Sequence, residues 1–157
     1  MPHGVFDKKE KKMKNITLTN YEITTIVKAL ENPDSILYTD NSNKILPVSL
    51  LWKMDENFEK LRSVYSRIEK KRSQIEQQFA DDEHSYEDTV DGQQIRKIKD
   101  KYAKDFSEKI NEFMILENTI EINPVLIKEF DGKSLTPRDY RNIRFMLDNE
   151  SEEKVDE

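Results

Sequence analysis

Residues 51–79 read LWKMDENFEKLRSVYSRIEKKRSQIEQQF and carry apolar residues at alternating intervals of three and four. This spacing places those side chains on one side of a helix. Because no Gly or Pro interrupts the run, it predicts one long helix from about Pro47 to about Gln78. We call this repeat the seam; it consists of Leu51, Met54, Phe58, Leu61, Tyr65, Ile68, Ile75 and Phe79. Only Arg72 breaks it.

A second amphipathic stretch follows at residues 93–116, with Ile95, Ile98, Tyr102, Phe106, Ile110 and Phe113 near a period of 3.6. It predicts a return helix that lies antiparallel to the first. The intervening residues 81–92 end in Asp91-Gly92, a turn signal, and are expected to connect the two helices at a tip that accommodates a small β-turn. In this arrangement the seam residues from Phe58 to Ile68 pack on the return helix from Ile110 back to Ile98.

Shorter elements are expected at the base of this hairpin. Residues 16–18 and 117–122 read as strands and predict a small two-stranded β ribbon. Thr19 and Glu22 form a capping-box pattern for a short helix, and Thr136 with Pro137 begins a last helix whose Tyr140, Ile143 and Leu147 face the core. Trp52 is expected to pack against a terminal helix. The predicted fold class is therefore mainly α, a long antiparallel, coiled-coil-like helical hairpin with short terminal helices.

The length of 157 residues suits one domain, which we place at residues 14–147. Residues 1–13 are expected to be a disordered extension, an alternative start or a remnant of cloning, and residues 148–157 a disordered acidic tail. Hydrophobic residues make up 35% of the chain and charged residues 37%, which favours a thin, elongated core. No apolar run approaches the roughly 18 residues of a membrane span, so no membrane association is expected.

The residue types that support catalysis are scarce in this sequence. The only histidines are His3 and His84, and there is no cysteine, which excludes disulfides and thiol catalysis. No phosphate-binding loop, dinucleotide motif or nucleophile elbow is present. His84 lies among carboxylates, but an acidic solvated loop is favoured over a metal or acid/base site. The sequence thus predicts a protein that is not an enzyme and binds neither a cofactor nor a metal.

Charge is divided unevenly along the chain. The formal net charge is −6, yet residues 1–14 hold five lysines against Asp7 and Glu10, or +3, and leave −9 for the remainder. Such an acidic body disfavours direct nucleic-acid binding and suits a basic protein surface. The candidate partner-binding residues are the carboxylates of the tip, Asp81, Asp82, Glu83, Glu87, Asp88 and Asp91.

The order of motifs resembles a known family. It runs from NITLTNYE at 15–22 through the long charged helix to DDEHSYEDTVDG, KIKDKYAKDFSEKINEFM, ENTIEINPV and LTPRDYRNIRFML. Over residues 13–147 this order is similar to domain-of-unknown-function family 1617, small proteins of tailed phages of Gram-positive bacteria. The resemblance implies a phage protein that acts in the cytoplasm of the infected host. The family supplies no catalytic residues.

Three functions are compatible with these features. The favoured one is a non-enzymatic protein-binding module that assists phage morphogenesis like a tail-assembly chaperone, with the seam covering an amphipathic helix of a tail protein. The second is an acidic inhibitor of a host defence enzyme, such as an anti-CRISPR protein, acting through the charges of residues 81–91 and 148–157. The third is a self-assembling coiled-coil structural protein in which the seam forms homo-oligomer contacts.

Overall fold

The computed structural model describes residues 12–38, 46–130 and 135–148. Within these ranges it contains α2 (Asn20–Glu31), α3 (Val48–Gln77), α4 (Asp100–Met114) and α5 (Pro137–Ile143). Two antiparallel two-stranded sheets accompany the helices: β1 (Lys14–Thr19) with β4 (Glu117–Ile122), and β2 (Ser85–Val90) with β3 (Gln93–Ile98). Two single turns of 3₁₀ helix complete the chain, η2 (Ile127–Phe130) and η3 (Arg144–Met146).

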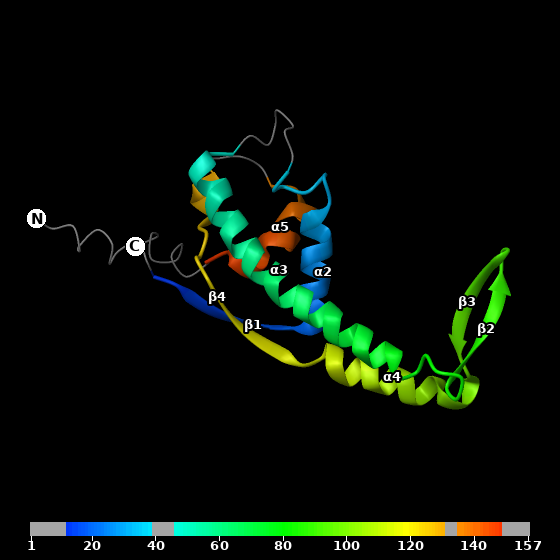
Figure 1. Ribbon diagram of the computed structural model, residues 1–157. Helices are drawn as coiled ribbons and strands as arrows, with labels where there is room; N and C mark the ends of the chain where they lie inside the picture. Colours follow the sequence, from blue (N-terminus) through cyan, green and yellow to red (C-terminus); the bar gives the residue numbers. More distant parts are fainter. Residues whose placement is uncertain (1–11, 39–45, 131–134, 149–157) are drawn as a thin grey trace, which may run out of the picture.

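The predicted fold class is wrong. Of the residues that the structure describes, 56% are helical and 21% lie in strands, a mixed architecture in place of a mainly α, coiled-coil-like hairpin. Residues 93–98, expected to begin the return helix, form β3, and α4 starts only at Asp100. With β2 they build a β-hairpin that projects from the far end of α3 and α4 (Figure 1). Two-residue turns with positive φ favour such hairpins, and Asp91 (φ 51°) and Gly92 (φ 79°) form this one.

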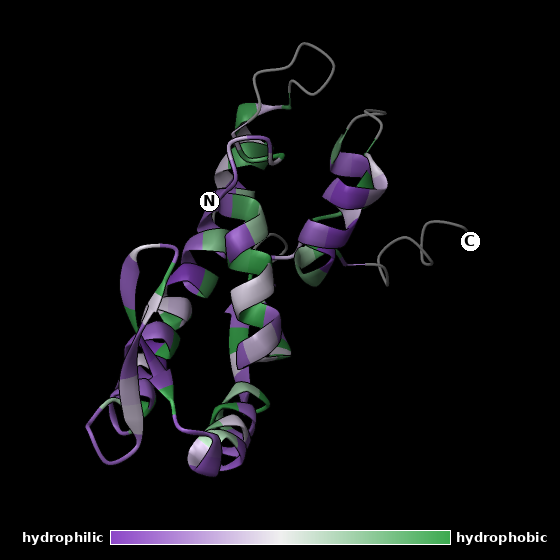
Figure 2. Ribbon diagram, turned by 90° about the vertical axis from the view of Figure 1, so that its right-hand side faces the viewer, coloured by the Kyte–Doolittle hydropathy of each residue, from purple (hydrophilic) through white to green (hydrophobic). Residues whose placement is uncertain are grey.

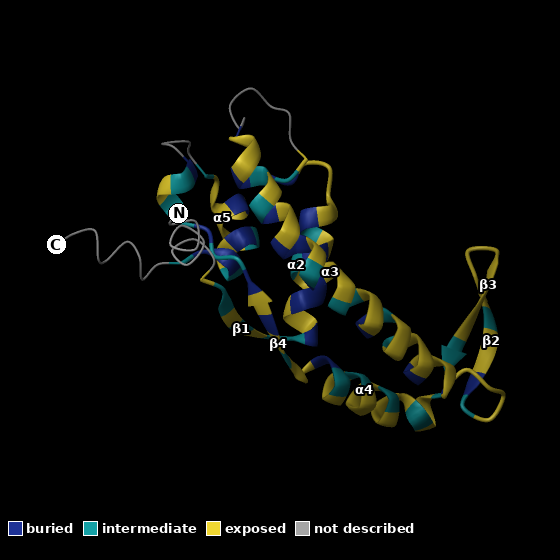
Figure 3. Cartoon of the chain, turned by 60° about the vertical axis from the view of Figure 1, so that its left-hand side comes forward, coloured by how far each residue is buried: buried dark blue, intermediate teal, exposed yellow. Residues whose placement is uncertain are grey.

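The long helix itself is confirmed. α3 covers residues 48–77, within one residue of the predicted bounds at each end. Its first half is buried on the expected side, where Met54, Phe58 and Leu61 have no exposed surface. Leu50 (2% exposed) begins this side, and the predicted Leu51 is only half-buried. α2 and β4 pack against this half, and residues coloured as buried concentrate in this part of the molecule (Figure 3).

The ribbon at the base and both predicted caps are confirmed. β1 pairs with β4 in the register Ile16 to Ile120, and both strands bury alternate side chains. Thr19 Oγ1 accepts from the N–H of Glu22 at 3.0 Å, while the Glu22 carboxylate accepts from the N–H of Thr19 at 2.8 Å. At α5, Thr136 Oγ1 accepts from the N–H of Asp139 at 3.0 Å, with Pro137 in the first turn.

The predicted register between the two long helices is wrong as well. α4 has fifteen residues against thirty in α3 and lies beside its second half only (Figure 1). The Phe106 ring therefore meets the Phe79 ring, with centroids 5.3 Å apart, rather than Leu61. Phe58 and Leu61 instead join the core cluster that includes Ile23 and Val27 of α2. The shift follows from the shorter helix, because six residues of the predicted return helix are spent on β3.

Two aromatic side chains expected in the core are exposed. Trp52 is 68% exposed on the outer side of α3, one residue away from the seam. Tyr140 is 37% exposed, although its neighbours Ile143 and Leu147 are buried as predicted.

Of the predicted terminal segments, residues 1–11 and 149–157 lie outside the described ranges. Hydrophobic residues recur at intervals along the helices between hydrophilic ones, as Figure 2 shows.

Candidate functional site

Three hollows lie in a row between α3 and α4, with volumes of about 290, 320 and 380 Å³. The first and second share Phe113 and Leu116, and the second and third share Lys109 and Glu112. Adjacent hollows thus have walls in common, and together they form one continuous surface feature, the α3–α4 groove. Its wall on α3 consists of Val64, Arg67, Ile68, Lys71, Ile75 and Gln78, with Phe79 just beyond the helix.

The groove follows one side of each helix. Its residues on α3 recur at intervals of three and four, the spacing of a single helix face. The same spacing holds on α4, whose wall consists of Tyr102, Asp105, Glu108, Lys109, Glu112 and Phe113, followed by Leu116. The groove therefore runs parallel to the helix pair, from Asn20 and Asn118 at the β ribbon to His84 at the base of the β-hairpin.

The groove is open because a single helix covers the second half of α3. In that half the seam residues Ile68, Ile75 and Phe79 are 3–8% exposed, so α4 covers them well. Met114 is the only buried residue of α4, and the apolar residues Tyr102, Phe106, Ile110 and Phe113 of this helix are half-buried. Leu116, one turn beyond Phe113, is 56% exposed. Apolar surface thus remains in water along the groove.

The two rims of the groove carry opposite charge. Arg67 and Lys71 are exposed on the α3 side, near the β ribbon. Asp105, Glu108 and Glu112 are exposed on the α4 side, nearer the β-hairpin. Lys109 reaches across from α4, where its ammonium group donates to Gln78 Oε1 at 3.0 Å. A ligand in the groove would meet cations of α3 near the β ribbon and carboxylates of α4 nearer the β-hairpin.

The end of the groove near the ribbon is fixed by asparagines. Asn20 Nδ2 donates to the carbonyl of Phe113 at 2.8 Å, and its Oδ1 accepts from Asn118 Nδ2 at 2.8 Å. The backbone N–H of Asn20 also donates to the carbonyl of Leu116 at 2.9 Å. These bonds tie the start of α2 to the end of α4, and they hold Phe113 and Leu116 in place.

The six tip carboxylates do not form one acidic surface. Asp81, Asp82 and Glu83 precede β2, Asp91 is in the hairpin turn, and Glu87 and Asp88 are successive residues of β2. Successive strand residues point to opposite faces, which separates the last two. Arg96 on β3 lies 3.2 Å from Asp82 and 3.7 Å from Glu87, and Lys97 lies 3.0 Å from Asp88. The pairing of β2 with β3 thus places Arg96 and Lys97 beside these carboxylates. The prediction of an acidic solvated loop did not include these cations.

These ion pairs shift the proton affinities of the tip. The hydrogen bond from Lys97 lowers the pKa of Asp88, and the same bond raises the pKa of Lys97. A side-chain hydrogen bond with His84 lowers the pKa of Asp81. Each shift stabilises the charged form of its group, so the tip contains compensated charges at neutral pH.

His84 connects the hairpin to the helices. Its ring centroid lies 4.5 Å from that of Tyr102 and 5.5 Å from that of Phe79, and its Nδ1 lies 2.6 Å from Asp81 Oδ1. Its carbonyl accepts from the N–H of Lys99 at 2.9 Å, which closes the hairpin at its base. Ligand atoms of Asp81, Glu83 and His84 also lie within 4.8 Å of one another, but both carboxylates are exposed and Nδ1 is engaged. These contacts anchor the hairpin to α3 and α4.

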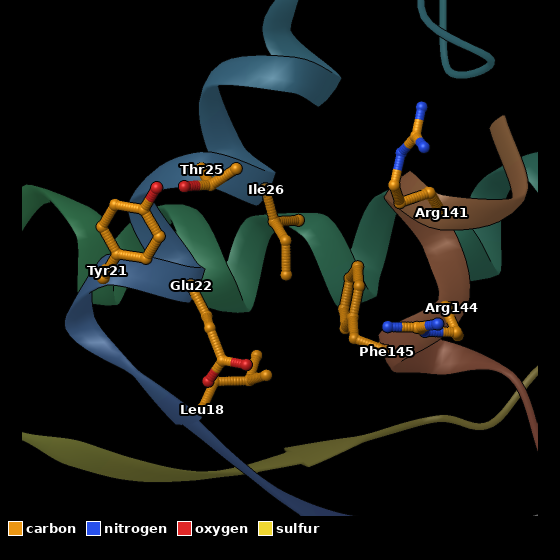
Figure 4. A pocket seen from close by; sticks show the side chains of 8 residues that line it. All are labelled: Leu18, Tyr21, Glu22, Thr25, Ile26, Arg141, Arg144 and Phe145. Atoms are coloured by element: carbon orange, nitrogen blue, oxygen red, sulfur yellow. The ribbon is translucent and has the colours of Figure 1, made fainter. Parts of the chain in front are cut away.

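A separate hollow of about 250 Å³ lies between α2 and the C-terminal elements (Figure 4). We call it the arginine pocket; it is lined by Leu18, Tyr21, Glu22, Thr25, Ile26, Arg141, Arg144 and Phe145. Figure 4 shows Ile26 and Phe145 between the two arginines on one side and Tyr21 with Glu22 on the other. No pattern in the sequence indicates this pocket, since its two walls are more than a hundred residues apart in the chain.

Comparisons of this chain with known proteins and structures find no relative. No protein-family model matches the chain, and no curated protein or solved structure matches it either. The resemblance to domain-of-unknown-function family 1617 therefore stays a prediction. Among the described residues, no helix has the length and apolar character needed to cross a membrane.

Proposed function

We propose that the protein is a non-catalytic protein-binding module that receives an amphipathic helix of another protein in the α3–α4 groove. The observation that carries the proposal is the continuous groove beside a seam that only one helix covers. Its α3 wall extends from Val64 to Gln78, about 21 Å at a rise of 1.5 Å per residue. A bound helix of about four turns would fill that length.

The shape of the groove favours a helix as its occupant. Two helices side by side present parallel rows of side chains, into which a third helix packs at a separation of about 8–10 Å. Apolar residues of such a ligand at positions i, i+3, i+4 and i+7 would contact Val64, Phe113 and Leu116, which are half-buried or exposed. Each Å² of apolar surface removed from water stabilises the complex by about 25 cal/mol. The cations near one end of the groove and the carboxylates near the other would set the direction in which the ligand lies along it.

The resemblance to the phage family supplies a setting for this activity. We place the protein in the cytoplasm of the infected host, where it would cover an amphipathic helix of a tail protein until assembly. Inhibition of a host defence enzyme has less support, because Asp82, Glu87 and Asp88 already face cations of β3. We do not retain self-assembly through a coiled-coil seam, because the seam residues pack within this chain, partly in the mixed core and partly against α4.

Adjacent exposed residues permit a sharp test. Leu116 (56% exposed) lines the groove, whereas Ile115 (68% exposed) lies next to it and lines none of the three hollows. A photo-crosslinking phenylalanine analogue is placed at one position or the other, and the protein is produced in infected host cells. We expect a discrete covalent adduct with one other protein from position 116 after irradiation, and little or none from position 115.

The captured protein is then purified and its affinity measured by calorimetry. Leu116→Asp should weaken binding roughly 10- to 100-fold, because it removes an apolar contact and places a charge in the interface. Ile115→Asp is the matched control and should change affinity less than about threefold. Equal adducts from both positions, or no adduct from position 116, would refute the groove as the binding site.

A further inference from the structure

The arginine pocket combines two cations with an apolar floor. Arg141 on α5 and Arg144 on η3 are one helical turn apart and both are exposed. Within the described part of the chain neither guanidinium takes part in an ion pair, whereas Arg62, Arg72 and Arg96 all do. Beside them Ile26 and Phe145 are half-buried and provide apolar surface. A ligand for this pocket needs carboxylates for the two guanidinium groups and an apolar group beside them.

We propose that the arginine pocket binds the acidic C-terminal segment of the same chain, residues 149–157. That segment reads NESEEKVDE, with five carboxylate side chains and one lysine. Val155 is its only apolar residue; Glu152, Glu153 and Lys154 precede it, and Asp156 and Glu157 follow it. Asp156 and Glu157 thus place two carboxylates directly beside an apolar side chain, as the two arginines beside Ile26 and Phe145 require.

Chain connectivity makes this occupant accessible. Leu147 is fixed beside Val125 by a β-bridge, and Asp148 donates its N–H to the carbonyl of Val125 at 2.9 Å. Val155 is eight residues beyond Leu147, which allows a reach of up to about 26 Å. Arg144, in the pocket wall, lies only three residues before Leu147. A tether of this length gives an effective concentration in the millimolar range, so weak contacts suffice for occupancy.

Docking of the segment would neutralise the pocket and cover its floor. Two guanidinium groups can each hold a carboxylate with paired N–H donors, while Val155 covers Ile26 and Phe145. Glu22 lies on the same rim, but its carboxylate accepts from the N–H of Thr19 at 2.8 Å in the capping box. A second acidic ligand could enter only by displacing the segment, which would make the pocket selective for strongly acidic sequences.

The absence of cysteine from the sequence permits a direct test in the full chain. Thr25→Cys introduces a thiol at the exposed rim of the pocket, and Val155→Cys a second one in the segment. The matched control pairs Val155→Cys with Glu121→Cys, which is exposed on β4 four residues from Val125 and outside the pocket. In a glutathione buffer the equilibrium between dithiol and disulfide reports the effective concentration of the two thiols.

We expect the pair at 25 and 155 to show an effective concentration at least tenfold above that of the control pair. Arg141→Glu with Arg144→Glu should reduce it to the control value, as should 0.5 M salt, whereas Arg141→Lys with Arg144→Lys should keep most of it. Both arginines are exposed, so the charge-reversed variant should retain the wild-type unfolding midpoint. Equal effective concentrations for the two pairs, or no response to charge reversal, would overturn the proposal.

Discussion

The two halves of α3 carry the same apolar repeat but lie in different surroundings. In the body, which we define as β1, α2, residues 48–61 of α3, β4 and α5, the repeat is packed on by α2 and β4 and joins a core that includes Ile143. In the arm, which comprises the remainder of α3, α4 and the β2–β3 hairpin, α4 is the one helix that lies along it (Figure 1). A repeat thus specifies which side of a helix is buried, but not how many elements bury it.

The difference separates stability from binding. Met54, Phe58 and Leu61 have no exposed surface, so the body is closed and has no apolar surface left at these positions for a partner. Along the arm the residues of α4 are half-buried, and apolar surface remains on the flank of the helix pair. Substitutions in the body should therefore act on folding, and those in the groove on association.

The largest expected effect is that of Phe58→Ala in the body. Its ring is fully buried, and truncation leaves a cavity, so the free energy of unfolding should fall by about 3–5 kcal/mol. Phe106→Ala in the arm removes a half-buried ring and should cost about 1–2 kcal/mol. Denaturant unfolding followed by circular dichroism measures both. Equal losses would mean that the arm is packed as tightly as the body.

A buried amide gives the next largest effect. Asn57 is fully buried, its Nδ2 donates to the carbonyl of Asn123 at 2.7 Å, and its Oδ1 accepts from the N–H of Asn123 at 2.8 Å. Asn57→Ala leaves both backbone groups without this partner and should cost about 2–3 kcal/mol.

Asn111→Ala on the exposed side of α4 makes the same chemical change in the arm. Its effect on the free energy of unfolding should stay within about 0.5 kcal/mol, measured by the same denaturant titration. A loss at Asn111 comparable to that at Asn57 would contradict the division into a closed body and an open arm.

The sequence was sufficient for elements with local signals. α3 has an apolar repeat that only Arg72 breaks, the capping residues Thr19 and Thr136 are followed by the partners they need, and the alternation at 117–122 identifies β4. Each of these depends on residues fewer than about ten apart, where spacing alone fixes the geometry.

The error at residues 93–98 has a physical cause. Ile95 and Ile98 continue the spacing of Tyr102 and Phe106, so a helical period and a strand both fit the six residues. The turn at Asp91-Gly92 decides between them, because it brings β3 alongside β2 and satisfies its backbone by cross-strand pairing. A stronger weight on that dipeptide, together with Tyr86 and Val90 as strand formers, would have identified the hairpin.

The candidate sites could be predicted only in part. The seam was expected to offer surface to a partner, and the groove runs beside three of its residues, Ile68, Ile75 and Phe79. The α4 wall depends on a register that the misplaced start of the return helix concealed. The arginine pocket unites residues 18–26 with residues 141–145, and nothing in either segment alone indicates that they meet.

A smaller effect is expected at the turn of the hairpin. Gly92 has φ +79°, and a Cβ added there would meet nothing within 4 Å, so Gly92→Ala tests the backbone conformation alone. An L-residue in this region costs about 1 kcal/mol. Amide hydrogen exchange in β2 and β3 should therefore accelerate about fivefold, with no change in α2. Accelerated exchange throughout the body would show that the arm and body unfold together.

The smallest effect concerns pH and the ion pair at the middle of the hairpin. Lys97 lowers the pKa of Asp88, whose Oδ1 also accepts from the N–H of Thr89 at 2.8 Å. A carboxylate with a lowered pKa in the folded state stabilises it fully above the unfolded value near 4, and this contribution is lost as the pH falls through the folded value. Conversely, the raised pKa of Lys97 means that its ammonium group stabilises the folded state fully below the unfolded value near 10.4, and this stabilisation is lost as the pH rises past the folded value.

Amide signals of Thr89 and Ile95, followed by NMR from pH 7 to pH 2, should reveal opening of the hairpin in the wild type below about pH 4, before α2 responds. Asp88→Asn should already be more open at pH 7 and should lose this part of the pH dependence; a titration identical to that of the wild type would show that the pair does not stabilise the arm.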